Sequence, residues 1–312
     1  TVGAQIISYR KAVLIMAFVV ILGGVLQGHH VRKTVGKGLV ISQSGVYEGH
    51  HGEEAGPEFW SYFPDNRLPD KAILVALLSA GFFVTLATFS SIPVSTSQAI
   101  VGGVAGVGIG IVGFNATYFK LAVLLKIFSA WVVSPILTMI LAFILYYLLG
   151  LLLKRARSIV WSQVMAVAVV ISAAYVSYSL GANDVGNAIG PLLSKYPDKG
   201  VWLAVLGGVA MAVGAMTFGA RVTDTVGKSI TPLDYGGALS AQLAAAFGVH
   251  LFSMAGIPVS TSQAVVGGVI GVGLTKGMKA VSTGKISTIF LGWVITPTCA
   301  AIFAAVVYRL VA

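Results

Sequence analysis

The chain has 312 residues, of which 57% are hydrophobic and only 10% are charged, and its formal net charge is +10 at pH 7. Soluble domains carry about 25% charged residues, so this composition excludes an ordinary soluble protein and predicts an integral membrane protein. The apolar runs are long and continuous, which favours membrane helices over a barrel of alternating strands.

The first half of the chain contains three long apolar runs, at 12–28, 73–90 and 121–153. Each run is close to or longer than the roughly 20 residues that a membrane helix needs. The third run contains Pro135, so we expect it to be kinked, strongly tilted or divided into two pieces. The polar segment 41–70 holds six of the ten acidic residues and is predicted to be an extramembranous loop.

The second half is predicted to contain five further segments: 161–190 with a break at its end, 200–219, 238–256, 257–274 and 286–309. The fold class predicted for the chain is an all-α membrane protein with about ten transmembrane or re-entrant helical segments. Re-entrant hairpins are an alternative to full spans at Pro93 and Pro258.

The chain also contains an internal repeat. The sequence Ile-Pro-Val-Ser-Thr-Ser-Gln-Ala occurs at 92–99 and again at 257–264. Two further pairs follow the same order: Thr-Val-Gly-Lys at 34–37 and 225–228, and Trp-Val-Val-Ser-Pro at 131–135 with Trp-Val-Ile-Thr-Pro at 293–297. A tandem duplication explains this order, with a first repeat at 1–153, a basic linker at 154–160 and a second repeat at 161–312.

The number of segments in each copy predicts how the two copies are oriented. An odd number inverts the second copy relative to the first, which is the plan of many secondary transporters, with the binding site at the midplane where both copies meet. Near the start of the chain the two copies are offset by 191 positions, so the counterpart of Gly181 would precede Thr1. We therefore expect that the first repeat lacks its own copy of the helix that contains Gly181.

The segment 181–191 places Asp184 between Asn183 and Asn187 after an apolar run. An ionisable group at membrane depth costs at least a few kcal/mol, so we expect it to bind or pair with something there. In a helix the two asparagines lie one turn apart, and the gathered oxygens suit sodium or a proton carried by Asp184. The alternative is a polar patch that joins two helices.

The duplicated Pro-Val-Ser-Thr-Ser-Gln element predicts an anion site. Proline and Ser/Thr suit the start of a helix, whose free N–H groups attract anions. The hydroxyls would then form a neutral cradle for an oxyanion: Ser95, Thr96, Ser97, Ser260, Thr261 and Ser262. The alternative is ordinary helix capping. Two identical copies in symmetric positions favour the anion site.

Secondary candidates are Gln98 and Gln263, which follow the hydroxyls, and the repeated polar residues Thr34, Thr225 and Lys228. Basic residues near span ends usually extend to the membrane interface, and a role in anion entry is the less favoured interpretation. No zinc-site spacing, Walker motif or nucleophile–base arrangement is present. We therefore predict a protein that is not an enzyme, with no cofactor besides a coupling ion.

Residues 181–188, Gly-Ala-Asn-Asp-Val-Gly-Asn-Ala, resemble the Gly-Ala-Asn-Asp-Val-Ala-Asn-Ala signature of the PiT inorganic phosphate transporter family. The duplicated element resembles that family's Pro-Val-Ser-Thr-Thr-His-Ala. In this chain Gly186 replaces Ala, and Ser-Gln replaces Thr-His in both copies. The resemblance implies a multi-pass helical carrier of the cell membrane with inverted repeats, often a homodimer, that couples phosphate uptake to sodium or protons.

By this resemblance Asn183, Asp184 and Asn187 would line the cation and phosphate sites, and the Ser and Thr residues of both elements would hold the anion. We expect a secondary-active phosphate importer that works by sodium symport, with protons second, through alternating access about a midplane site. The alternatives are a permease for sulfate or another oxyanion and, less favoured, an anion channel. The expected partners are phosphate, sodium and the lipid bilayer, with no nucleic acid.

Overall fold

The computed structural model describes residues 8–37, 68–90, 94–114, 119–153, 159–193, 195–228, 230–277 and 281–312. Within these ranges the chain forms helices and connecting turns, and no strand occurs in them. Pro93, most of the predicted loop and most of the predicted linker lie outside the described residues, so the repeat boundaries stay a prediction. The described part confirms an all-α fold.

The helices of the first half are α1 (Tyr9–Leu26), α2 (His29–Lys37), α4 (Asp70–Phe89), α5 (Thr96–Val112) and α6 (Leu121–Leu153). Those of the second half are α7 (Ile159–Leu180), the π-helical turn η2 (Gly181–Val185), α8 (Gly186–Leu193), the 3₁₀ turn η3 (Pro197–Lys199), α9 (Gly200–Lys228), α10 (Tyr235–Met254), α11 (Thr261–Thr275) and α12 (Thr283–Val311).

In the described ranges, seven helical segments are long and apolar enough to cross a membrane, and α7, η2 and α8 together form one of them. The helices α5 and α11 are shorter, with 17 and 15 residues, and both are apolar. These nine segments agree in outline with the prediction of about ten. Both short helices begin beside buried serines, Ser95 and Ser260, so they start inside the protein and not at its surface.

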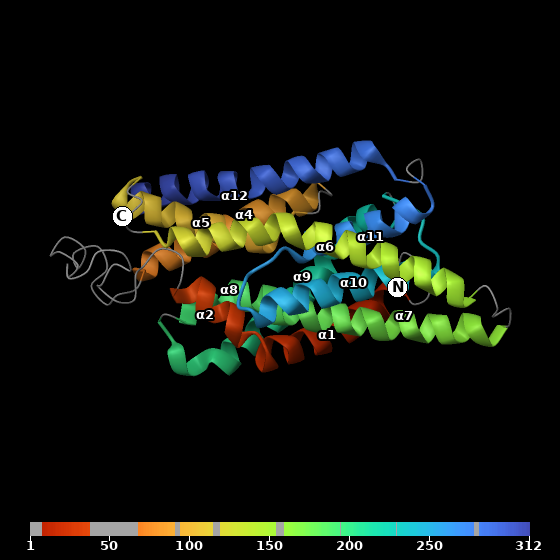
Figure 1. The fold of residues 1–312 in the computed structure, drawn as a ribbon. Helices are drawn as coiled ribbons and strands as arrows, with labels where there is room; N and C mark the ends of the chain where they lie inside the picture. Colours follow the sequence, from red (N-terminus) through yellow and green to blue (C-terminus); the bar gives the residue numbers. More distant parts are fainter. Residues whose placement is uncertain are drawn as a thin grey trace.

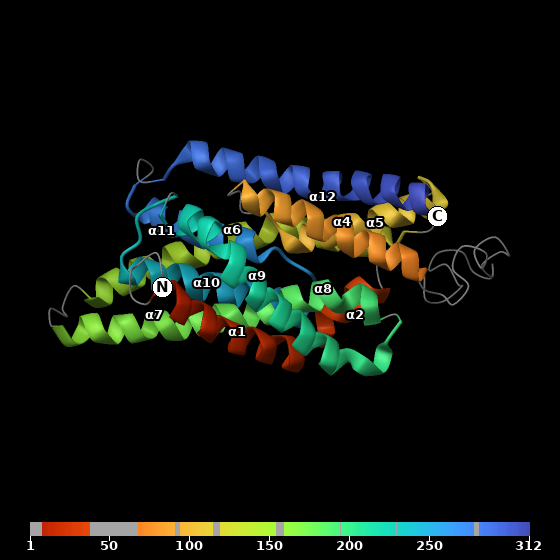
Figure 2. The same ribbon diagram turned by 180° about the vertical axis from the view of Figure 1, so that it is seen from behind.

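Equivalent helices of the two halves run in opposite directions. The α1–α2 pair occupies 9–37 and α9 occupies 200–228, which are the same range at the offset of 191 positions. Figure 1 shows α6 running away from the end of the molecule that carries the C-terminus, and its equivalent α12 running back towards that end. Figure 2 shows the same antiparallel relation from behind. The repeats are therefore inverted, as predicted.

The two halves exchange their short helices. Helix α5 packs on α12, and its equivalent α11 packs on α6. Glycines make both contacts possible, because a Cβ at Gly106 would collide with the backbone oxygen of Ala301, and a Cβ at Gly271 would collide with that of Met139. Small residues that let helix backbones approach are typical of membrane helix interfaces. Each short helix therefore packs on the last long helix of the opposite half.

Two local predictions can be compared with these helices. The alternative of two separate pieces for 121–153 is excluded, because α6 is one continuous helix that contains Pro135. The predicted break at Gly190 and Pro191 is wrong, since both residues lie inside α8 and the irregular turn is η2, which ends at Val185. Pro191 stands in the sixth position of α8, and the helix continues through it to Leu193.

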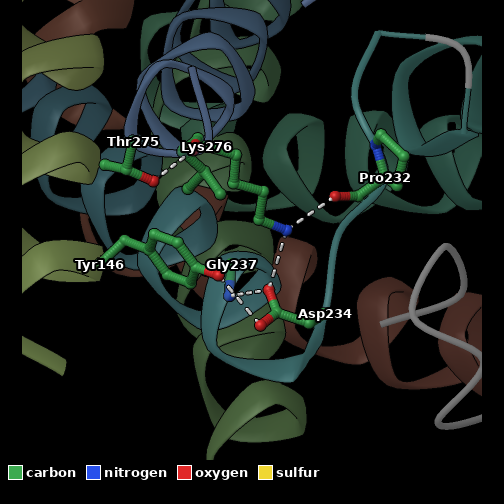
Figure 3. Close-up of polar contacts among 7 residues, drawn as sticks. Tyr146, Pro232, Asp234, Gly237, Thr275 and Lys276 are labelled. Atoms are coloured by element: carbon green, nitrogen blue, oxygen red, sulfur yellow. Dashed lines mark hydrogen bonds and ion pairs between the residues drawn. The ribbon is translucent and has the colours of Figure 1, made fainter. Parts of the chain in front are cut away.

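Polar contacts at one end of the molecule join α6, α10 and α11 (Figure 3). Asp234 precedes α10 and accepts a hydrogen bond from the Gly237 N–H, 3.0 Å away, as a helix cap. The Tyr146 hydroxyl of α6 donates to the same carboxylate over 3.0 Å. Lys276, at the end of α11, donates to the Pro232 carbonyl over 3.0 Å and lies 3.4 Å from the Asp234 carboxylate. These contacts fix the three helices together outside the apolar core.

Candidate functional site

The Asn/Asp segment predicted as a site is fully enclosed by the protein. Asp184 is 7% exposed, and Asn183 and Asn187 are not exposed at all. Asn183 and Asp184 lie in η2, and Asn187 lies in the first turn of α8. A π-helical turn inside an α-helix is frequent at functional sites. The three polar side chains therefore occupy the protein interior and do not face lipid.

Asp184 has hydrogen-bond donors but no cationic partner. Its Oδ1 atom accepts a hydrogen bond from Asn183 Nδ2 at 2.6 Å and lies 3.4 Å from the Ser97 hydroxyl oxygen. Within the part of the chain that the structure describes, no lysine, arginine or histidine forms an ion pair with this carboxylate. A buried charge that is only hydrogen-bonded is unfavourable, so the site suits a cation or a proton.

Asn183 connects this turn to the start of α11. Its amide nitrogen donates to the Val259 carbonyl over 2.7 Å, and its amide oxygen accepts from the Val259 N–H over 3.1 Å. The same nitrogen lies 3.5 Å from the Thr261 hydroxyl oxygen. Both ends of the amide are thus engaged with the second Pro-Val-Ser-Thr-Ser-Gln element.

Asn187 connects α8 to the start of α5. Its amide nitrogen donates to the Ser97 hydroxyl oxygen over 2.6 Å. Its amide oxygen is buried and has no hydrogen-bond partner. An unpaired buried acceptor costs about 1–3 kcal/mol, and such an oxygen is a ligand that a hard cation can use.

The starts of α5 and α11 meet each other through two equivalent hydrogen bonds. The Ser97 hydroxyl donates to the Val259 carbonyl over 2.6 Å, and the Ser262 hydroxyl donates to the Val94 carbonyl over 2.9 Å. The two pairs are related by the repeat, because both residues shift by 165 positions. The duplicated elements therefore lie together where the two halves meet.

The remaining predicted hydroxyls differ in their surroundings. Ser95 and Ser260 cap their helices, because their oxygens accept from the backbone N–H groups of Gln98 at 3.2 Å and Gln263 at 3.1 Å. These two serines therefore act as ordinary helix caps, which was the alternative to an anion site. Thr96 is half-buried. The side-chain oxygens of both glutamines are buried and have no hydrogen-bond partner.

Of the secondary candidates Thr34, Thr225 and Lys228, the structure describes the side chain of Thr34 alone. Thr34 lies against the turn before α11, where a Cβ on Gly256 would be 3.3 Å from its hydroxyl oxygen. Thr225 and Lys228 belong to α9, and their side chains lie outside what the structure describes. Of the predicted site residues, the structure therefore brings Ser97 and Thr261 into contact with the Asn/Asp segment.

Sequence reasoning missed the backbone groups of this site. The Val259 carbonyl and N–H, together with the Val94 carbonyl, bind the predicted side chains, although valine itself carries no polar group. The preceding carbonyl, that of Pro258, accepts a hydrogen bond from Trp131 Nε1 at 3.2 Å. The repeated tryptophan was the one signal in the sequence that could have indicated this anchor.

The chain is similar over most of its length to several known proteins. A protein from Thermococcus kodakarensis, named as a candidate phosphate permease, is 27% identical over an alignment of 392 positions that covers 99% of this chain and 90% of that protein. A similarly named protein from Methanocaldococcus jannaschii is 32% identical, with 76% of this chain and 75% of that protein covered.

A solved structure described as the sodium-dependent phosphate transporter superposes with a TM-score of 0.80. It is 27% identical to this chain, and the match covers 99% of this chain and 92% of the other. The sequence model described as the phosphate transporter family matches residues 1–304. The chain is therefore a multi-pass membrane protein that belongs to the phosphate transporter family.

Proposed function

We propose that this protein imports inorganic phosphate by symport with sodium, through alternating access about the site around Asp184. The observation that carries the proposal is a buried carboxylate that pairs with no basic side chain among the described residues and contacts side chains from both halves of the chain. Such a carboxylate becomes stable in the membrane interior when a cation binds to it.

The cation would bind among oxygens that the structure gathers around Asp184. The carboxylate itself, the unpartnered amide oxygen of Asn187 and the hydroxyl oxygens of Ser97 and Thr261 are the candidate ligands. Sodium prefers oxygen ligands, like other hard cations. The solved structure of similar fold is described as sodium-dependent, which supports sodium over a proton.

The anion would bind at the starts of α5 and α11. Partial positive charge at two helix N-termini and several hydroxyls form a neutral but anion-attracting surface. The hydroxyls of Ser97 and Ser262 donate to carbonyls across the interface between the two halves. Binding of phosphate would exchange these bonds for bonds to the anion, and the two helix starts would separate as it enters.

Coupling follows from the charges. A phosphate ion next to Asp184 would be repelled, and a cation on the carboxylate removes that repulsion. Each ion therefore strengthens the binding of the other, which is a reciprocal coupling free energy. Rocking of the two inverted repeats about the shared site would then expose it to each side of the membrane in turn.

The test is uptake of radiolabelled phosphate into proteoliposomes. We expect saturable uptake that requires an inward sodium gradient and shows counterflow. A pH gradient alone should drive it weakly, and sulfate should compete poorly. Equal uptake without sodium would contradict the sodium symport, and stronger transport of sulfate would replace phosphate as the substrate. Unsaturable flux without counterflow would indicate an anion channel.

A further inference from the structure

An arginine is buried at a second place in the molecule, away from the residues that contact Asp184. Arg32 lies in α2 and is 7% exposed. Its Nη1 atom donates to the Gly200 carbonyl over 2.6 Å, and its Nε atom is buried without a partner. No acidic residue in the described part of the chain forms an ion pair with it. A guanidinium has five N–H donors, so most of its binding capacity is unused.

A glycine lies directly beside the guanidinium of Arg32. The group lies between the end of α8 and the start of α9, where a Cβ on Gly200 would be 3.3 Å from Nη1 and 3.5 Å from a methyl carbon of Leu193. Lys195 and Lys199 stand in the short connection between these two helices, and each ammonium lies over the ring of Tyr196, at 5.5 and 5.6 Å. The start of α9 adds the partial positive charge of a helix N-terminus.

The internal repeat shows that an arginine at this position belongs to one copy only. At the offset of 191 positions, Arg32 corresponds to Thr223 and Lys33 corresponds to Asp224. The helical role of the segment therefore does not require an arginine here. A buried cation is costly when no acidic residue pairs with it, and none of the described residues does, so its presence in the first copy calls for a separate reason.

The position of the group fits the boundary between membrane and water. The apolar span of α1 ends at Leu26, just before α2. Tyr196 is 40% exposed and Trp202 is 75% exposed, and such aromatic residues are typical of membrane interfaces. Figure 2 shows α2 and the start of α9 at the same end of the molecule. Phosphate oxygens of lipid headgroups lie at this depth, and dissolved phosphate also reaches it.

We propose that Arg32 anchors a second anion site, which binds the phosphate oxygens of a lipid headgroup or of a free phosphate ion. The planar guanidinium matches two oxygens of a phosphate group, and the unused Nε and Nη donors supply the hydrogen bonds. On the exposed side Lys199 adds positive charge, whereas Lys195 is paired with Asp70 and Asp198 lies in the same connection. This site is separate from the site around Asp184 and does not depend on the transport proposed there.

The test is thermal unfolding of the purified full-length chain in neutral detergent, with three titrants. All titrations are made in sodium-free buffer, so that the site around Asp184 lacks its coupling ion. Short-chain phosphatidylglycerol supplies lipid phosphate, potassium phosphate supplies the free ion, and a glycolipid of the same chain length supplies neither. We expect phosphatidylglycerol, phosphate or both to raise the unfolding temperature by about 2 °C or more, and the glycolipid to have no effect.

The variants are Arg32→Met and, as a matched control, Arg309→Met. Arg309 also donates one hydrogen bond to a glycine carbonyl, that of Gly110, but it is exposed. Arg32→Met should lose the shift that wild type shows, whereas Arg309→Met should keep it. Loss for phosphatidylglycerol identifies a lipid site, and loss for phosphate identifies a site for the free ion.

A second variant keeps the proposal testable if Arg32→Met does not fold. Gly200→Val retains the arginine and fills the space beside its guanidinium. We expect it to need at least about 5-fold more titrant for the same shift, since the bound anion would be displaced. The proposal is overturned if wild type responds to neither phosphate compound, or if the substituted proteins respond as wild type does.

Discussion

The two Pro-Val-Ser-Thr-Ser-Gln elements are identical in sequence but differ in their contacts. Each begins a short helix and provides a serine cap, at Ser95 and Ser260. Ser97 of the first element contacts Asn183, Asp184 and Asn187. Its equivalent in the second element, Ser262, is bonded to Ser260 and to the carbonyl of Val94. The same residues therefore form the same local structure in both copies, and only one of the two serines joins the polar site.

The difference has its origin in how η2 and α8 contact the two elements. They reach α5 through a side chain, that of Ser97, and reach the start of α11 mainly through the backbone of Val259. A hydroxyl can exchange its partner for an ion, whereas a backbone pair holds a helix in place. We infer that the first element contributes more to binding than the second, which also positions its helix, and the substitutions below test that division.

The largest effect is expected for Asp184→Asn, which removes the negative charge that Ser97 of the first element contacts. Sodium-driven phosphate uptake should fall about 100-fold, which corresponds to about 2.8 kcal/mol, while the protein stays folded because the amide retains the shape. Uptake into proteoliposomes measures the loss. Asp198→Asn, at an exposed acid of η3, is the control and should transport as wild type does.

The next effect concerns packing, where the two halves should behave alike. Gly106→Ala and Gly271→Ala should each lower the free energy of unfolding by about 2 kcal/mol, because each new methyl collides with a backbone oxygen. Gly81→Ala, where the methyl would meet open space, should be neutral or stabilising by up to about 1 kcal/mol. Denaturant unfolding measures all three. Very different losses at Gly106 and Gly271 would show that the exchanged helices are not equivalent.

A smaller effect should separate the two serines directly. Ser97→Ala removes a hydroxyl that contacts Asp184 and Asn187, and we expect about a 10-fold loss of uptake, or about 1.4 kcal/mol. Ser262→Ala removes one interhelical bond and should cost about 2- to 3-fold. The affinities for sodium and phosphate should be measured separately in each variant. Equal losses in both would contradict the division of roles between the elements.

The smallest effect is expected at the ends of α6 and α12. Tyr146→Phe removes a hydrogen bond to Asp234 and should reduce stability by about 0.5–1 kcal/mol, since the pair is exposed. The repeat equivalent, Tyr308→Phe, should change stability by less than about 0.5 kcal/mol. Thermal unfolding in detergent compares the two. A loss at Tyr146 no larger than the loss at Tyr308 would mean that the hydrogen bond to Asp234 does not stabilise α6.

Much of this fold could be predicted from the sequence. Long apolar runs determine the spans because lipid forces backbone groups into helices. Three repeated landmarks and the number of segments gave the inverted arrangement, which the antiparallel course of α6 and α12 confirms. The meeting of Asn183, Asp184 and Asn187 with Ser97 and Thr261 agrees with the predicted polar site.

Other features could not be predicted because they depend on tertiary contacts. Backbone groups such as those of Val259 are independent of the side chain, so no residue type indicates them. The irregular turn lies at Gly181–Val185 and not at Pro191, and α8 continues through the proline to Leu193. Two identical elements carry no information about which serine will contact Asp184. Arg32 appeared in the sequence as one of several basic residues near a span end, and only its burial distinguishes it.

The most direct test of the central claim is equilibrium binding of radioactive sodium to the purified protein. Wild type should bind sodium saturably, and phosphate should increase the affinity, because each ion offsets the charge of the other. Asp184→Asn should abolish this binding, and Ser262→Ala should leave most of it intact. Sodium binding by Asp184→Asn with the affinity of wild type would contradict the account, since the buried carboxylate would then not be the group that holds the cation.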